Sequence, residues 1–145
     1  MKRIISILIV IAIIIPVFTI TVKSEENWSG YIKISNPEDL KLMDGSRSNF
    51  YLTNDIDLSD WGVWQPISWF GGTLDGNGYA IKNITTTNGG LFHSLGRNIT
   101  NGGTIKNLGL QNVNIRRGAV VGALSNYAYF GTVIENCYIT GTIIS

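Results

Sequence analysis

The sequence offers few residues with the chemistry of a catalytic centre. His93 is the single histidine among 145 residues. A Ser-His-Asp arrangement needs a histidine held between a nucleophile and an orienting acid, and no serine of the chain lies in a nucleophile-elbow pattern. We therefore interpret His93 as a turn residue. Cys137, the single cysteine, is interpreted as a small apolar residue buried in a strand.

Aspartates are the other candidates for acid chemistry: Asp55, Asp57, Asp60 and Asp75. Glycoside hydrolysis needs two carboxyl groups roughly 5 to 10 Å apart across a sugar, and a hard cation such as Ca²⁺ is held by several oxygens. Asp55 and Asp57 alternate, so in a strand they share a face. No calcium-loop spacing surrounds them, and capping of turns and strand ends is the simpler interpretation. We assign no catalytic residue, no metal site and no cofactor.

Three tryptophans form the one cluster that suggests ligand binding. Trp61, Trp64 and Trp69 lie close together, joined by Phe70, beside a polar segment. Aromatic faces exposed on a shallow surface hold sugars by stacking and apolar contact. The alternative is that these large side chains cover the end of a β structure. The three tryptophans are the candidate glycan platform.

The N-terminus predicts the compartment. Lys2 and Arg3 precede an apolar run that reaches Val22, as in a secretory signal, and cleavage is expected after Ser24. The run is about 19 residues long, near the roughly 20 that span a bilayer, so an uncleaved anchor is the alternative. Residues 1–24 are the predicted signal peptide of a secreted or cell-surface protein, which would touch a membrane only through this segment.

Charge argues against a nucleic-acid partner. Loss of Lys2, Arg3 and Lys23 with the signal would change the formal charge from +1 to −2. This balance gives no electrostatic reason to bind nucleic acid. A single cysteine also excludes an internal disulfide, so stability has to come from packing and backbone pairing.

One short helix is expected, within an N-terminal cap of residues 25–49. In residues 35–43, Asn36 suits the cap position, Pro37 the first helical position, and Glu38 and Asp39 the positive end of the helix dipole. Apolar residues would face one side, namely Ile34, Leu40 and Met43. So short a helix would cover the end of a larger element.

From residue 50 to residue 145, short apolar runs alternate with Asn and Gly and form a degenerate repeat. An aliphatic residue, a polar residue and then Asn recur, ending at the structural ladder residues Asn54, Asn83, Asn107 and Asn136. These asparagines are 29, 24 and 29 positions apart. A repeat of this length, with no room for a helix in each unit, predicts a β-solenoid. Asn tolerates left-handed corners, and stacked amides bond to one another. The alternative is four unrelated turn asparagines in a β-sandwich.

The ordered series of motifs resembles the GLUG-motif repeat surface proteins of bacteria and archaea. The resemblance rests on the Ile-Ser-Asn-Pro-Glu-Asp-Leu segment at 34–40, the strand at 51–58, the Trp-Gln-Pro-Ile turn at 64–67, the Asp-Gly-Asn-Gly block within 70–83, and a GLUG-like unit at 121–143. Asn126 and His93 stand where the family has Gly, and both residue types are enriched at positive φ.

The resemblance implies an all-β, right-handed parallel β-helix with a pectate-lyase-like architecture and no particular reaction. We expect a secreted or surface scaffold, adhesive or glycan-contacting module rather than an enzyme. The alternative is a polysaccharide lyase or glycoside hydrolase on the same helix. The C-terminal end looks uncapped, so further repeats or another chain are expected there. Other expected partners are an extracellular glycan or a host or neighbouring surface protein.

Overall fold

Short parallel strands make up most of the fold. The computed structural model describes residues 26–98, 102–116 and 121–144; the predicted signal peptide lies outside these ranges. The strands are β1 (Tyr31–Ile34), β2 (Asn49–Leu52), β3 (Ile56–Asp57), β4 (Thr73–Asp75), β5 (Ala80–Lys82), β6 (Thr85–Thr86), β7 (Phe92–Leu95), β8 (Thr104–Lys106), β9 (Gly109–Arg116), β10 (Ser125–Ala128), β11 (Val133–Glu135) and β12 (Tyr138–Ile144). One 3₁₀ helix, η1 (Glu38–Met43), lies between β1 and β2.

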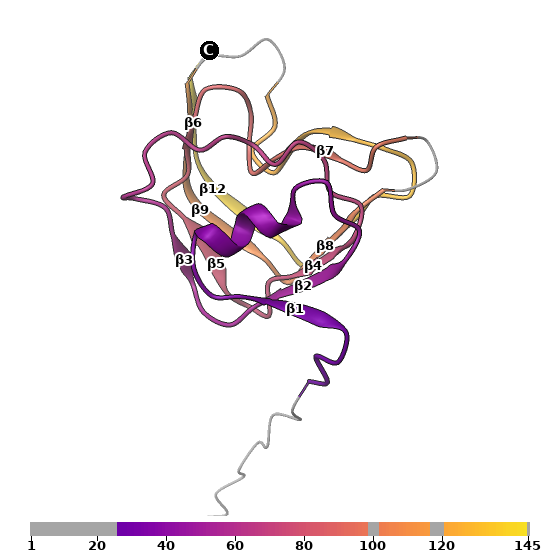
Figure 1. Ribbon diagram of the computed structural model, residues 1–145. Coiled ribbons are helices and arrows are strands. Elements are labelled where there is room, and N and C mark those ends of the chain that lie inside the picture. The colour runs from indigo at the N-terminus through magenta and orange to yellow at the C-terminus, as the bar shows by residue number, and fades with distance from the viewer. Residues whose placement is uncertain (1–25, 99–101, 117–120, 145) are drawn as a thin grey trace, which may run out of the picture.

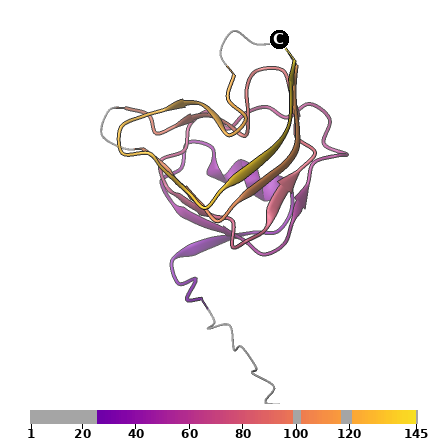
Figure 2. The same ribbon diagram turned by 180° about the vertical axis from the view of Figure 1, so that it is seen from behind.

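The strands form three sheets in which every pairing is parallel. The first sheet has the order β1-β2-β4-β8-β11, the second pairs β7 with β10, and the third has the order β3-β5-β9-β12, with β6 also beside β9. From β4 onward the chain visits the first, third and second sheets in turn, and then returns to the first. We call one complete circuit through the three sheets a pass. The three sheets surround a common interior (Figures 1 and 2), and the prediction of a mostly β, parallel-stranded chain is confirmed.

Inside the sheets, equivalent residues of successive passes stack into apolar columns. Phe50 pairs in register with Leu74, and Leu74 with Ile105. In the third sheet, Ile56 pairs with Ile81, and Ile81 with Leu110. All six are at most 1% exposed. Because side chains of a strand alternate between its faces, this register places the neighbouring polar residues on the outside.

The predicted helix is present, in a shorter and tighter form. It begins at Glu38, directly after Pro37, and Oδ1 of Asn36 accepts a hydrogen bond from the Asp39 amide at 3.0 Å. Leu40 and Met43 are fully buried, as the apolar pattern predicted. In Figure 1 the helix lies across the opening between the first and third sheets. It therefore closes one end of the interior.

The coils were expected from residue 50, after a cap at 25–49, and strand pairing begins within that cap. β1 lies inside the predicted cap, yet its four residues pair with the four residues of β2. The first sheet therefore begins at Tyr31. The helix is an insertion between the first two strands of that sheet.

The opposite end of the interior is uncovered in the described residues. β11, β10 and β12 are the outermost strands of the first, second and third sheets. Their apolar side chains are exposed, as in Phe130 just before β11 at 81%, Ile134 at 51% and Ile139 at 46%. The described residues include no helix long and apolar enough to cross a bilayer.

Candidate functional site

The four predicted ladder asparagines do not form one stack. Asn136 and Asn107 lie at the same corner, directly after β11 and β8, and the side-chain amide of Asn136 donates to Oδ1 of Asn107 at 2.7 Å. Asn107 in turn donates to Oδ1 of Asp75 at 3.0 Å. Both asparagines have positive φ, 52° at Asn107 and 49° at Asn136. Two of the four residues are thus bonded side chain to side chain at this corner, which follows the first sheet.

Asn83 belongs to a different corner, which the sequence alignment missed. It follows β5 of the third sheet, accepts a hydrogen bond from the side chain of Asn112 at 2.7 Å, and donates to Asp57 at 2.8 Å. Asn54 lies in neither ladder, and its amide bonds to the backbone carbonyls of Ser35 and Asp55. The two corners require the same left-handed backbone and the same amide bonding, so the same local motif serves at both.

Asp55 and Asp57 are both held by structural contacts. Oδ1 of Asp55 accepts the Ala80 amide at 2.9 Å and its Oδ2 pairs with Lys82 at 2.5 Å. The bond from Lys82, followed by that from Ala80, lowers the pKa of Asp55. The bond from Asn83, followed by that from the Ser59 amide, lowers the pKa of Asp57. Both carboxyls therefore stay ionised acceptors, which suits a structural role and not a general acid.

Asp75 is nearly buried, and Asp60 is exposed. Asp75 is 4% exposed; it accepts the Asn77 amide at 2.8 Å and pairs with Lys106 at 3.1 Å. The bond to Asp75 raises the pKa of Lys106. Asp60 makes no hydrogen bond or ion pair with the described residues, and it does not converge with the other aspartates on a site.

Trp64 cannot belong to an exposed glycan platform. Its side chain is 1% exposed, and its indole Nε1 donates to the Leu91 carbonyl at 3.1 Å. Lys41 covers its ring, with Nζ 3.7 Å from the ring centroid, and this burial lowers the pKa of Lys41. Trp61 packs against the same core and lies 5.9 Å from Trp64 between ring centroids. Trp64 therefore fills part of the apolar interior, as in the alternative that these tryptophans cover the end of a β structure.

Trp69 is partly exposed, and its neighbours are ones that the sequence did not indicate. The guanidinium carbon of Arg47 lies 5.8 Å from the Trp69 ring centroid, and that of Arg97 lies 5.6 Å from it. Arg47 follows η1, and Arg97 follows β7. Because the two arginines are 50 positions apart in the chain, no local motif could have joined them.

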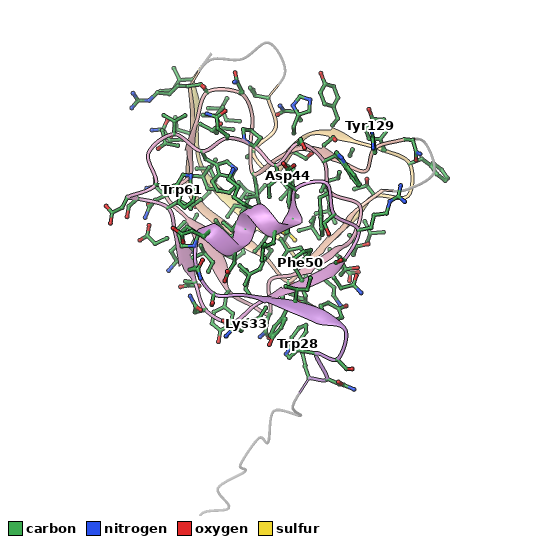
Figure 3. The ribbon with its side chains drawn as sticks, viewed as in Figure 1. Trp28, Lys33, Asp44, Phe50, Trp61 and Tyr129 are labelled. Carbon is green, nitrogen blue, oxygen red and sulfur yellow. The ribbon has the colours of Figure 1, made fainter. Side chains whose placement is uncertain are left out.

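A second aromatic group, also missed, lies outside the first sheet. Trp28 stacks on Tyr51 with 4.3 Å between ring centroids, and its edge meets Tyr31 at 5.3 Å. Tyr31 and Tyr51 lie on the neighbouring strands β1 and β2. Figure 3 shows Trp28 beside β1, just before the strand begins. Trp28 therefore packs the segment just before β1 against the outside of the sheet.

His93 and Asn126 are not the left-handed turn residues that were expected. Both lie in strands, β7 and β10, and neither is among the positive-φ residues of the described chain. His93 is exposed, with its ring edge-on to Tyr127 at 5.3 Å. Cys137 is partly buried, and that burial raises the pKa of its thiol.

The described residues bring no metal ligands together. In the ranges 26–98, 102–116 and 121–144, no three His, Cys, Asp or Glu side chains form a group that could hold an ion. A small hollow next to the first corner is lined by Glu26, Asn77, Gly78, Asn107 and Asn136. Its one carboxylate, on Glu26, leaves it short of the several charged oxygens that a hard cation prefers.

Comparison with known sequences gives one family. The family model for the M26 IgA1-specific metallo-endopeptidase N-terminal region matches residues 68–141, which is half of the chain. No curated protein and no solved structure matches.

Proposed function

Since this chain belongs to the family of M26 IgA1-specific metallo-endopeptidase N-terminal regions, we propose that it is a non-catalytic β module of a secreted or surface protein. Its role would be that of a scaffold or adhesive domain, on whose open end further parallel strands stack. A peptidase zinc site takes three protein ligands, mostly His with Glu. The sequence has one histidine, and the described residues hold no three-ligand group, so that chemistry would belong to a different region.

For the architecture we propose a right-handed parallel β-helix, carrying a GLUG-like repeat at residues 121–143. Its support is the regular visit of the chain to three parallel sheets and the in-register columns inside them. In such a helix each pass rests on the one before it and offers the same surface to the next. The asparagine ladders at two corners fit this arrangement, because each amide bonds to the equivalent corner one pass away.

The single observation that carries the proposal is that the last apolar side chain of each column is exposed. The column Phe50, Leu74 and Ile105 is buried, and its next member, Ile134, is 51% exposed. Ile56, Ile81 and Leu110 are likewise buried, and Ile139 is 46% exposed. These two isoleucines point to the same interior as their buried equivalents. They are exposed because no further layer covers them.

The geometry of the open end restricts what covers it. Three strands offer an unpaired edge, one in each sheet: β10, β11 and β12. An unpaired edge is a template for another strand. A single added strand would satisfy one edge only. An additional pass of the same handedness would satisfy all three in parallel register. We therefore propose further passes of this kind as the occupant, from a continuation of the chain or from a partner.

Adding one pass tests this proposal directly. Ile144 pairs with Arg116, so a copy of residues 117–144 joined after Ile144 would continue the register. We expect the denaturant m value to rise, because more surface is buried on folding. Tm should rise by at least about 4 °C, the shift that about 1 kcal/mol produces in a domain of this size. A scrambled copy of the same segment is the control, and equal behaviour of the two fusions would refute stacked growth.

The non-catalytic part of the proposal has its own test. The folded chain would be incubated with pectin, alginate and plant glycans, with and without Ca²⁺, and with a panel of peptide substrates. We expect no product, because Asp55 and Asp57 are held by Lys82, Ala80 and Asn83. Glycan cleavage that disappears in the Asp55→Ala and Asp57→Ala variants would instead establish a lyase or hydrolase.

A further inference from the structure

Parallel stacking brings Arg47, Trp69 and Arg97 together from three successive stretches of the chain. Ser46 pairs with Phe70, and Phe70 with Leu95, in parallel bridges. Each member of the cluster lies one or two positions from these bridges. The same stacking thus aligns a guanidinium, an indole and a second guanidinium along the outside of the molecule. Both arginines are exposed, and Trp69 is partly exposed.

Neither arginine is neutralised by the described residues. The two ion pairs found there join Lys82 to Asp55 and Lys106 to Asp75, at the corners of the first and third sheets. The nearest acid in sequence is Asp44, which lies just beyond the end of η1 (Figure 3). Its carboxylate accepts the backbone amide of Ser68 at 2.8 Å and also the Ser68 hydroxyl. Two positive charges therefore stand beside the Trp69 ring, and no carboxylate of the described residues is paired with either of them.

This combination suits a particular chemistry. A guanidinium offers a planar fork of N–H donors that matches a carboxylate in bidentate fashion. An indole face accepts apolar C–H groups of a ring and also holds cations above it. An inorganic anion would use the arginines and leave the indole unused. A neutral sugar would use the indole and leave both charges uncompensated.

We propose that Arg47, Trp69 and Arg97 form a binding site for an acidic sugar, a pyranose ring that carries a carboxylate, such as a sialic or uronic acid unit of a glycan. The ring stacks on Trp69 while the carboxylate is held by one or both arginines. A single-stranded nucleic acid also combines rings with anions. It needs a row of basic residues along its backbone, whereas this cluster has two. The inference gives a ligand class to the adhesive part of the proposed function and rests on it.

Titration with defined probes tests the site on the folded chain. N-acetylneuraminic acid and glucuronic acid are the acidic probes, lactose is the neutral control, sodium sulfate is the simple anion, and a short oligothymidylate represents nucleic acid. Binding would be followed by calorimetry and by tryptophan fluorescence. For a single sugar we expect a Kd on the order of 1 mM, weakened by added NaCl because exposed charges are screened. Lactose and sulfate should each bind at least about tenfold more weakly than the acidic sugars.

Variants assign the binding to the three residues. Arg47→Gln and Arg97→Gln should each weaken acidic-sugar binding about tenfold or more, and Trp69→Ala should abolish the fluorescence response and the binding. Arg116→Gln, at the exposed end of β9, is the matched control and should bind normally. The replaced arginines are exposed, so an unchanged near-ultraviolet circular dichroism spectrum would verify folding.

Three outcomes would overturn the site: no binding of either acidic sugar, equal binding of sulfate or lactose, or preferential binding of the oligonucleotide. None of these would alter the result of the added-pass experiment. Failure of the sugar site is thus distinguishable from failure of the scaffold.

Discussion

The side-chain amide of Asn136 donates a hydrogen bond to Oδ1 of Asn107 over 2.7 Å. The two residues are 29 positions apart in sequence and occupy equivalent corners of neighbouring passes. Asn107 is the middle member, because it also donates to Asp75. The ladder thus links three passes through side chains alone, alongside the backbone pairing of β4, β8 and β11.

Replacement of Asn107 tests the contribution of this ladder. Asn107→Ala removes both side-chain hydrogen bonds. It also places alanine, which has no side-chain amide to stabilise a left-handed backbone, at φ 52°. We expect a loss of about 2 to 4 kcal/mol in the free energy of unfolding, from the hydrogen bonds and from the left-handed backbone. Urea denaturation would measure it. Asn107→Gly keeps the backbone unstrained and should lose less. Equal losses in the two variants would mean that the amide bonds, and not the backbone, carry the effect.

Gly76 lies where the chain passes closest to its neighbour, and substitution there should be severe. A Cβ at this position would lie 2.4 Å from the Asn107 carbonyl oxygen and 2.6 Å from the Leu108 Cα. These are backbone atoms, which cannot move aside without breaking the register. Gly76→Ala is expected to cost at least about 2 kcal/mol.

Gly62→Ala is the matched control for Gly76→Ala. Gly62 has φ 80° with nothing within 4 Å of the added Cβ, so its substitution costs only the left-handed strain of about 1 to 2 kcal/mol. Thermal denaturation followed by circular dichroism would compare the two variants. A Gly62→Ala protein less stable than Gly76→Ala would contradict the close approach of the two passes.

Stability should fall in acid, partly through Asp55. The bond from Lys82 lowers the pKa of this carboxyl in the folded chain. A group of this kind stabilises the fold fully above its unfolded pKa of about 3.9, and the contribution is lost as the pH falls through the lower, folded value. The free energy of unfolding should therefore decline below about pH 4.

Asp55→Asn keeps an oxygen that can accept the Ala80 amide and removes the titrating charge. Its urea midpoint should consequently change less between pH 5 and pH 2 than that of the unaltered chain. Asp60→Asn, at an exposed carboxylate without a partner in the described residues, is the control variant. Identical profiles for all three proteins would exclude Asp55 as a source of acid sensitivity.

Truncation to Phe should destabilise the protein much more at Trp64 than at Trp69. Trp64→Phe removes volume from a side chain that is 1% exposed and leaves the Leu91 carbonyl without its indole donor. We expect a cost of about 2 to 4 kcal/mol. Trp69→Phe, at the surface, should cost less than about 1 kcal/mol. Chemical denaturation of both variants checks this, and a more harmful change at residue 69 would reverse the assignment of core and surface.

The sequence was sufficient to predict the elements that depend on local chemistry. The helix was predicted from Asn36, Pro37 and the apolar spacing of Leu40 and Met43. The Asp-Gly-Asn-Gly block has the composition of a turn, and Asn77 and Gly78 have positive φ. In both cases the residues that determine the conformation are neighbours in the chain.

Features that depend on how the passes stack could not be predicted in the same way. Two segments look equivalent in sequence, Ile81-Lys82-Asn83 and Ile105-Lys106-Asn107. They end strands of different sheets, and they look alike because each corner needs the same motif. The true equivalent of Asn83 is Asn112, in a segment that lacks the Ile-Lys pair. Whether a tryptophan is buried, and which arginine meets it, likewise depends on chain segments far away in sequence.

The covered end and the open end also define a direction for folding. The earliest strands in the chain, β1 and β2, lie at the end that η1 closes, and each later strand finds its partner already made. The pairings join residues between 18 positions apart, as in Tyr31 and Asn49, and 33 positions apart, as in Phe92 and Ser125. At about 5 to 20 residues per second, no strand waits longer than roughly seven seconds for its template. The chain can therefore fold by adding one layer at a time, from the covered end towards the open end.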